Sequence, residues 1–306
     1  MKSIIVSAFV LSLCVFVANA QTCADAAKQV APAMSAEAKL DYEKKLDEAR
    51  KIALTVPNGG DADSLVWYGR RTAYTGRYKD AIAIFTKAIN RWPQDARLYR
   101  HRGHRYITLR CFDDAIRDFE TAAKLVKGKP DEIEPDGLPN AQNIPTSTLQ
   151  SNIWYHLGLA YYLKGDFKKA EKAYGECMKV SKNGDMLAAT THWYYMTLRR
   201  LEKNPQAARL LEAIDGDFEV IENDDYLKLL RLYRGEVRAE ILLAGAGDPD
   251  KSGLGNASLG YGIGNWYLYN RDRLRAEQIL GRIVAGNQWA SFGYIAAEAE
   301  LARAKK

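Results

Sequence analysis

The stretch Trp154–Cys177, which reads WYHLGLAYYLKGDFKKAEKAYGEC, decides the fold. Its first half places large apolar residues and a glycine at steps of three, one and three, namely Trp154, Leu157, Gly158 and Tyr161. Such steps keep these residues on one face of an α-helix. Its second half repeats a helical step of four and three, at Ala170, Tyr174 and Cys177. Gly165 lies between the halves and can take the positive φ of a helix C-terminus, so the stretch predicts a helical hairpin.

The same spacing recurs along the chain. Ala81 and Phe85, and then Ala115 and Phe119, repeat the Ala-x3-aromatic step, and the two alanines lie 34 residues apart. Weaker versions follow at residues 193–211, 226–233 and 264–276. A helical hairpin of this size buries its apolar face only by stacking on a neighbour, so the pattern predicts an array of stacked hairpins.

The period of 34 residues and the pattern Trp-x2-Leu-Gly-x2-Tyr…Ala-x3-Phe resemble the tetratricopeptide repeat family. Pro93 supplies the closing proline of the first unit, whereas Lys127 and Lys182 stand at that place in the next two. The resemblance implies an all-α fold: a right-handed superhelix of five or six helical hairpins, with capping helices at both ends.

The positions of these units, and the composition of the segments between them, predict how the chain is divided into parts. The expected parts are a signal peptide at 1–20, an N-terminal capping region at 21–61 with a helix at 36–55, two units at 62–129, an insertion at 130–150, a third unit at 151–184, degenerate units at 185–290 and a C-terminal capping helix at 291–306. The insertion contains four prolines, too many for a helix, and four acidic residues.

The N-terminus has the three-part layout of a secretory signal. Lys2 precedes an uncharged run over residues 4–18, and Ala18-Asn19-Ala20 offers small residues where a signal peptidase reads, which predicts cleavage before Gln21. The run is short for a membrane-spanning helix, so no span is expected after cleavage. We therefore expect an exported protein, periplasmic or secreted.

Composition narrows the class of protein. Of the 306 residues, 47% are hydrophobic and 27% charged, which is typical of a folded, soluble chain and excludes disorder and a polytopic membrane protein. A net charge of +6 is too mild to indicate nucleic-acid binding.

Three cysteines remain after cleavage: Cys23, Cys111 and Cys177. Export permits a disulfide, but an odd number leaves at least one thiol unpaired within the chain. The sequence leaves the pairing open. Cys23 with Cys111 is the one bridge that we consider, because Cys177 holds a small helix position and is expected to be buried.

No enzyme motif is present. The chain lacks a phosphate-binding Gly-rich Lys motif, a His-Glu-x2-His motif and a haem-attachment motif. His101, His104 and His156 could meet on adjacent helices as a metal site, but Arg100, Arg102 and Arg105 would repel a cation. We expect no catalysis and no cofactor, and we expect these histidines to be exposed or hydrogen-bonded.

By resemblance, such arrays bind extended peptides on a concave face formed by the first helices. The second, fifth and ninth residue of each unit line that face. In the first three units these residues are Asp63, Val66 and Arg70; Arg97, Arg100 and His104; and Asn152, Tyr155 and Leu159. Because arginine binds carboxylates bidentately, a groove of Arg70, Arg97, Arg100, His104, Asn152 and Tyr155 favours an acidic guest.

The basic helix over 97–110 allows three interpretations. It contains five arginines and two histidines without an acid. It can form an open anion-binding groove, it can be neutralised by the acidic insertion folding back, or it can be a solvated surface. In a combination of the first two, the insertion is a lid that an acidic partner displaces.

The third and fourth units are rich in tyrosine, and we interpret most of these tyrosines as residues that pack between helices. Tyr155, Tyr161, Tyr162, Tyr194 and Tyr195 fall there, and most are expected to lie between helices.

These observations predict an exported, non-catalytic protein–protein interaction scaffold that holds an extended, acidic partner segment. It resembles exported bacterial tetratricopeptide proteins. The alternatives are a structural subunit of an envelope assembly complex and a histidine-based metal-dependent protein.

Overall fold

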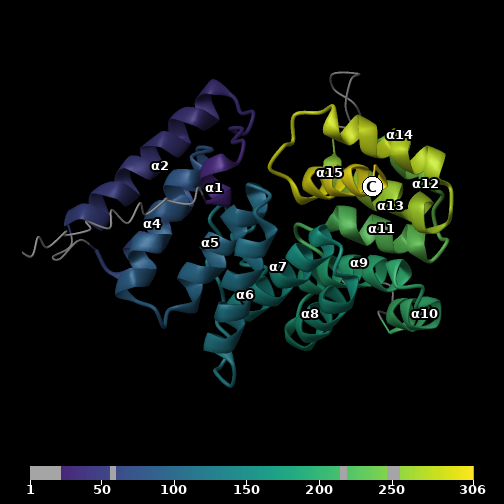
Figure 1. Ribbon diagram of the computed structural model, residues 1–306, viewed down its shortest axis with the longest axis horizontal. Helices are drawn as coiled ribbons and strands as arrows, with labels where there is room; N and C mark the ends of the chain where they lie inside the picture. Colours follow the sequence, from purple (N-terminus) through teal and green to yellow (C-terminus); the bar gives the residue numbers. More distant parts are fainter. Residues whose placement is uncertain (1–21, 56–59, 214–218, 247–255, 306) are drawn as a thin grey trace, which may run out of the picture.

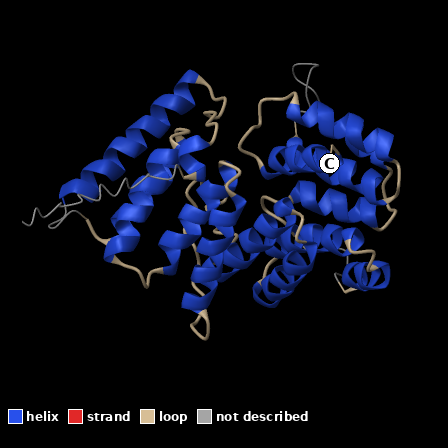
Figure 2. Cartoon of the chain, viewed as in Figure 1, coloured by secondary structure: helices blue, strands red, loops and turns tan. Residues whose placement is uncertain are grey.

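The computed structural model describes residues 22–55, 60–213, 219–246 and 256–305. The expected signal peptide and its cleavage position lie outside these residues. Within them the chain forms fifteen helices and no strand, apart from one isolated antiparallel bridge between Ile133 and Thr148 (Figure 2). The predicted all-α fold of stacked helical hairpins is confirmed.

Six hairpins follow one another along the chain (Figure 1). They are α3 (Ala62–Tyr74) with α4 (Tyr78–Arg91), α5 (Ala96–Thr108) with α6 (Phe112–Val126), α7 (Leu149–Lys164) with α8 (Phe167–Val180), α9 (Gly184–Arg200) with α10 (Asn204–Glu212), α11 (Asp224–Tyr233) with α12 (Ala239–Gly245), and α13 (Ala257–Tyr269) with α14 (Arg273–Val284). Helices α1 (Cys23–Ala26) and α2 (Ala36–Thr55) precede them, and α15 (Phe292–Ala304) follows.

The recurring spacing of the quoted stretch has a direct structural cause. A Cβ atom on Gly158 of α7 would come within 2.7 Å of the Tyr174 ring of α8, and one on Gly103 of α5 within 2.9 Å of Phe119 of α6. The aromatic ring of each second helix thus occupies the space that a side chain on the first helix would need. The predicted close helix approach is confirmed, and Gly165 turns between α7 and α8 with φ of 89°.

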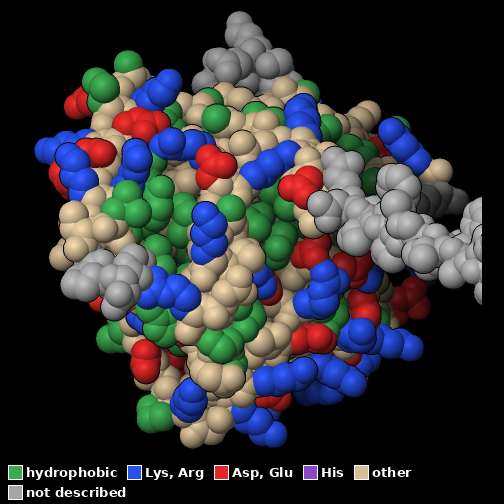
Figure 3. All heavy atoms as spheres, turned by 60° about the vertical axis from the view of Figure 1, so that its left-hand side comes forward, with side chains coloured by type: hydrophobic (Ala, Val, Ile, Leu, Met, Phe, Trp, Pro, Cys, Tyr) green, Lys and Arg blue, Asp and Glu red, His purple; other side chains and the backbone are tan. Residues whose placement is uncertain are grey.

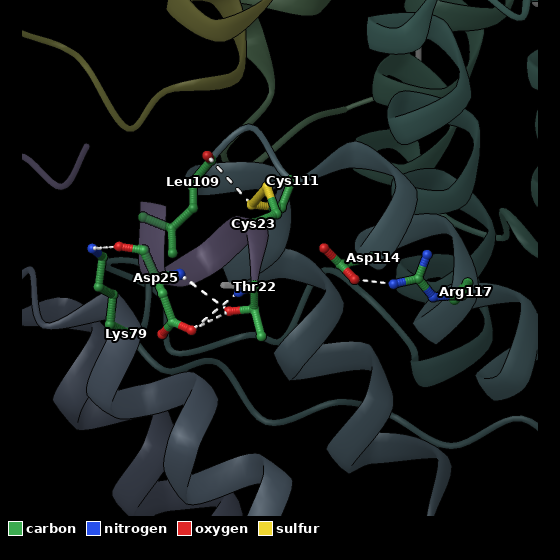
Figure 4. The surroundings of a disulfide bond; sticks show 8 residues. All are labelled: Thr22, Cys23, Asp25, Lys79, Leu109, Cys111, Asp114 and Arg117. Atoms are coloured by element: carbon green, nitrogen blue, oxygen red, sulfur yellow. Dashed lines mark hydrogen bonds and ion pairs between the residues drawn. A yellow bond between two sulfur atoms is a disulfide. The ribbon is translucent and has the colours of Figure 1, made fainter. Parts of the chain in front are cut away.

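The N-terminal segment is fixed to the first and second hairpins. Cys23 of α1 and Cys111, which precedes α6, form a disulfide with a Cα–Cα distance of 5.8 Å (Figure 4). Lys79 of α4 adds a hydrogen bond from its Nζ to the Asp25 carbonyl oxygen, at 2.9 Å. Cys177 is fully buried and unpaired, so both the considered bridge and the burial of Cys177 are confirmed.

The two ends of the array contact each other. Helix α15 packs on α13 and α14 and also contacts α7. The segment before it reaches the second hairpin, where the Arg110 guanidinium donates to the Trp289 carbonyl oxygen at 2.8 Å and pairs with Glu298 at 2.6 Å. Trp289 also stacks on Tyr78 at the start of α4, with 6.1 Å between ring centroids. The C-terminal helix therefore links the last hairpins to the first ones.

None of the described helices combines the length and apolar character needed to cross a membrane.

Candidate functional site

The inner face of the array is formed by the first helices of the hairpins, α3, α5, α7 and α9. Residues 130–150, called here the insertion, lie across this face. At one end the Arg71 guanidinium of α3 donates to the Gly137 carbonyl oxygen at 2.8 Å. At the other end the side-chain amide of Asn183, which caps α9, donates to the Thr146 carbonyl oxygen at 3.1 Å. The insertion thus spans the face from the first hairpin to the fourth.

The insertion delivers one carboxylate to the basic helix α5. Glu134 Oε2 lies 3.0 Å from Arg100 Nε, and its other oxygen lies 3.6 Å from His101 Nε2. The Asn152 amide of α7 donates to Glu134 Oε2 at 3.2 Å. Arg100 and Glu134 are each 8% exposed, so this is a buried ion pair, and the Asn152 amide supplies a hydrogen bond to its carboxylate. Burial lowers the pKa of Arg100, and the adjacent Glu134 carboxylate opposes that effect.

Backbone contacts hold Glu134 in this place. The Glu134 amide donates to the Ser147 carbonyl oxygen at 3.1 Å, and the Leu149 amide donates to the Glu132 carbonyl oxygen at 2.8 Å. Thr148 then caps α7 through a hydrogen bond from the Ser151 amide to its hydroxyl. The insertion is therefore closed at its base by the same residues that start the third hairpin.

Two other arginines of α5, and Arg110 just after it, pair with acids outside the insertion. Arg97 pairs with Asp95 and Asp63, Arg102 makes two hydrogen bonds to Asp118, and Arg110 pairs with Glu298. The reading of this helix as a solvated surface is wrong, because Arg100 is buried. Neutralisation by the insertion applies to Arg100, whereas acids of the same hairpin, of α3 and of α15 neutralise Arg97, Arg102 and Arg110.

Basic and acidic side chains are interspersed over the N-terminal face in Figure 3, without a field of one sign. Positive charge is instead concentrated on the inner face, where Arg70 lies close enough to Arg100 and Arg105 to lower the pKa of both. Burial lowers the pKa of Arg105 to about 10. Arg70 is 9% exposed, and its guanidinium lies 4.5 Å from the Trp67 ring centroid.

Beside the Arg100–Glu134 pair lies a cavity of about 340 Å³. Four of the six predicted groove residues line it: Arg100, His104, Asn152 and Tyr155. Arg70 and Arg97 do not line it, and two other predicted positions, Val66 and Leu159, are buried in helix packing. The structure thus gathers two predicted residues of the second unit and two of the third, whereas Arg97 of the second unit and Arg70 of the first lie outside the cavity.

The opposite wall of this cavity was not predicted. Tyr226 of α11, Phe292 of α15, Asp136 of the insertion and Glu222 also line it. The Tyr155 and Tyr226 hydroxyl oxygens are 3.3 Å apart. Burial and the nearby Glu222 raise the pKa of Asp136. No signal in the sequence relates these residues to α5 and α7, because they come from distant segments.

Glu222 is fixed by contacts to two segments. Its carboxylate accepts from the Asn140 amide at 2.6 Å and from the Thr146 hydroxyl at 3.1 Å, both in the insertion. Its backbone amide donates to Asp185 of α9, which also accepts from the amides of Ile221 and Asn223. The insertion is thus tied to the segment that leads into α11.

The three inner histidines pack as neutral aromatic rings. The His104 and His156 rings lie 4.7 Å apart, and His104 lies 5.3 Å from Phe292. Burial, with nearby arginines, holds the pKa of His101, His104 and His156 well below 6.5. The geometry favours packing over metal binding for these rings.

In the described part of the chain, one group of at least three side chains could hold a metal: Cys23, Cys111 and Asp114. The two sulfur atoms are joined in the disulfide, and Asp114 pairs with Arg117 (Figure 4). This group is therefore not a candidate metal centre.

The tyrosine prediction is confirmed for most members. Tyr161, Tyr162 and Tyr195 are buried between helices, whereas Tyr155 and Tyr194 are half-buried.

Comparison with known proteins places the quoted stretch in a family. Residues 151–183 match the tetratricopeptide repeat family model. The fold is similar to that of YrrB, described as a TPR protein with an unusual peptide-binding site, at 16% identity, with a TM-score of 0.40, over 85% of this chain and 97% of that one. It is also similar to a tetratricopeptide repeat protein from Parabacteroides merdae ATCC 43184, at 14% identity, with a TM-score of 0.47, over 86% and 96%. No curated protein matched the sequence. The family match falls on α7 and α8, the hairpin that contributes Asn152 and Tyr155.

Proposed function

Because the chain is a tetratricopeptide repeat protein, we propose that it is an exported, non-catalytic scaffold that holds an extended acidic segment of a partner protein on its inner face. The repeat fold itself supports a role in protein–protein interaction. The acidic character of the partner and the site of binding are the finer parts of the proposal.

The observation that carries it is the carboxylate of Glu134 on Arg100 and Asn152. The insertion is an irregular segment with four acidic residues and no lysine or arginine between Pro130 and Gln150, and it lies across the inner face. It therefore occupies this face as an acidic peptide would. A partner segment that exchanges with it would place its own carboxylate on the same guanidinium.

The charges that remain after such an exchange favour an anion. Glu134 and Asp136 both belong to the insertion and would leave with it. Arg70, Arg100 and Arg105 belong to α3 and α5 and would stay. Three neighbouring guanidinium groups bind carboxylates more strongly than the same number of dispersed charges, because their donors are oriented and partly desolvated.

Export is supported by two observations. The first is the secretory layout of residues 1–20. The second is the Cys23–Cys111 disulfide, because such bonds persist in oxidising compartments outside the cytosol. Both agree with a periplasmic or secreted location, which cell fractionation with a thiol-labelling assay of Cys23 and Cys111 tests.

Affinity purification tests the binding site. The baits are residues 21–306 of the wild type and of Glu134→Gln, Arg100→Gln and Glu132→Gln, each applied to the envelope fraction of the cell that makes the protein. Glu134→Gln weakens the internal occupant, so a partner should be captured in larger amount. Arg100→Gln should lose the partner. Glu132→Gln is the matched control, because Glu132 is an exposed acid of the same insertion.

A thermal melt of each bait separates loss of binding from loss of folding. Asp136→Asn serves as a second activating variant if Glu134→Gln does not fold. A partner captured equally by wild type and Arg100→Gln would refute the proposed site.

A further inference from the structure

The outer side of α7 carries a second groove, away from the inner face. It has a volume of about 970 Å³ and lies between α6 and α8, with α7 beneath it. None of the residues that line the inner cavity lines this groove.

The floor of the groove is apolar. It includes three repeat-pattern residues of α7, Trp154, Leu157 and Tyr161, with Ala123 of α6 and Ala173 of α8 beside them. The other four are buried in helix packing, whereas Trp154 is half-buried, so part of its large apolar ring remains available to a ligand. Burying such a surface is the main source of affinity for an amphipathic segment.

The rims of the groove are basic. They carry five lysines, one from α6, one directly after it and three from α8: Lys124, Lys127, Lys169, Lys172 and Lys179. Two acids also line the groove, and each already has a partner. Glu120 accepts a hydrogen bond from the Tyr161 hydroxyl, and Glu176 pairs with Lys179.

Three of these lysines can pair with the carboxylates of a ligand. Lys124, Lys127 and Lys172 are exposed and form no ion pair with any residue that the structure describes. They come from both rims, so they can contact carboxylates on both sides of a bound segment.

The length of the groove sets the size of its occupant. It extends along α8 from Lys169 to Val180, which is about three helical turns, or roughly 16 Å at 1.5 Å per residue. A helix of about 12 residues matches that length.

We propose that this groove binds an acidic amphipathic helix of a partner protein. The apolar side of that helix would lie on the accessible part of Trp154, which Leu157 and Tyr161 support from below, and its carboxylates would meet the lysines of the two rims. Helix-in-groove binding of this kind uses anchors at i, i+3 or i+4 and i+7. The inference goes beyond the proposed function, because it assigns a second surface and shares no residue with the inner site.

Two other occupants fit the groove less well. In a symmetric contact a second copy of the chain would bring the same lysines against themselves, which is repulsive. A bilayer surface would meet the lysine rims but not the recessed floor. The concave shape and the charge together favour a peptide helix.

A synthetic helix tests the proposal. The probe is a fluorescent 12-residue peptide with leucine or phenylalanine at i, i+3, i+4 and i+7 and glutamate at most other positions. Its binding to residues 21–306 is measured by fluorescence anisotropy. The first control peptide has the same composition in an order without helical periodicity, and the second has lysine in place of glutamate.

Variants locate the binding. Lys124→Glu combined with Lys172→Glu should weaken probe binding about tenfold or more and reduce its salt dependence. Lys39→Glu with Lys44→Glu is the matched control, because these two lysines are exposed on the distant helix α2 and make no ion pair with a described residue. Trp154→Ala tests the floor and should also weaken binding.

Several results would overturn the proposal. Equal binding of the reordered peptide would show that charge alone acts, and unchanged affinity of the Lys124/Lys172 variant would show that the probe binds elsewhere. Equal binding to vesicles with anionic lipid, lost in the same variant, would indicate a membrane instead of a peptide. Arg100→Gln should leave probe binding unchanged, so the groove and the inner site can fail independently.

Discussion

The two sides of helix α7 are built in opposite ways. On the inner side, Asn152 and His156 lie among buried charges and rings, and the chain itself covers them with the insertion and α15. On the outer side, Trp154 and Leu157 lie under an open groove with solvated lysine rims. The same helix therefore offers one face that the protein has already occupied and one that it has left accessible.

The difference shows how the consequences of substitution should divide. Buried ion pairs and hydrogen bonds on the inner side depend on each other, so removing one partner leaves the other desolvated and unpaired. Charges on the outer rim exchange protein contacts for water at little cost. Inner substitutions should change stability, and outer ones should change binding with little effect on stability.

The largest effect is expected from Glu134→Ala. Arg100 would remain buried without its carboxylate, which should lower the free energy of unfolding by about 3–5 kcal/mol. Urea denaturation followed by circular dichroism measures this. Glu132→Ala, in the same insertion but exposed, should stay within about 0.5 kcal/mol. If the two variants lose the same stability, the inner side is not held by this pair.

The second-largest effect is expected from acidic pH, which should lower the free energy of unfolding. The pKa of His156 is held well below 6.5 in the folded chain, mainly by burial. Below pH 6.5 the unfolded chain takes up a proton on this imidazole that the folded chain does not. The contribution of the neutral ring to stability is therefore fully present above that pH and is lost as the pH falls. At pH 5 the loss amounts to about 2 kcal/mol for one imidazole that stays neutral.

His156→Gln should remove that share of the acid sensitivity. The difference in unfolding free energy between pH 7.5 and pH 5 should shrink by about 2 kcal/mol relative to the wild type. An unchanged difference would mean that the ring is protonated without cost in the folded state.

Tyr155→Phe should have a smaller effect on the inner side. It removes the hydroxyl that lies 3.3 Å from the Tyr226 hydroxyl, at a cost of about 1 kcal/mol. Tyr99→Phe serves as the control, because the Tyr99 hydroxyl makes an exposed hydrogen bond to the Pro93 carbonyl oxygen that water can replace. Thermal denaturation of both variants provides the measurement, and equal losses would contradict the contrast between a partly buried and an exposed hydrogen bond.

The smallest effect on stability is expected on the outer rim. Lys172→Glu should change the free energy of unfolding by less than about 0.5 kcal/mol, because Lys172 is exposed and makes no ion pair within the described residues. The same variant should weaken binding of the acidic probe helix. A destabilised Lys172→Glu would show that the rim is part of the fold, and the contrast between the two sides of α7 would no longer hold.

Much of the fold was predictable because its signals are local. The helix expected at residues 36–55 is α2, and the glycines expected at close approaches and turns, Gly103, Gly158 and Gly165, have those roles. One turn shows the limit of this reasoning. Arg110 takes a φ of 65° before Cys111, where no glycine indicates a left-handed residue, and its side chain is held by Trp289 and Glu298.

The candidate site was predictable only in part. Arg100, His104, Asn152 and Tyr155 meet because the period of the repeat places equivalent residues on one face. Arg97 pairs with acids of its own neighbourhood instead, and the aromatic wall of Tyr226 and Phe292 was missed.

The sequence by itself determined the helical hairpins, their glycine and aromatic contacts, and the burial of Cys177. These features depend on a helical period and on close approaches between residues that lie near each other in the sequence. The tertiary structure decided which carboxylate neutralises Arg100, that Cys23 bonds to Cys111, and that α15 closes on α7. These choices depend on how the stacked hairpins curve and bring distant segments together. That curvature results from small rotations between many neighbouring units, so it cannot be predicted from any single stretch of sequence.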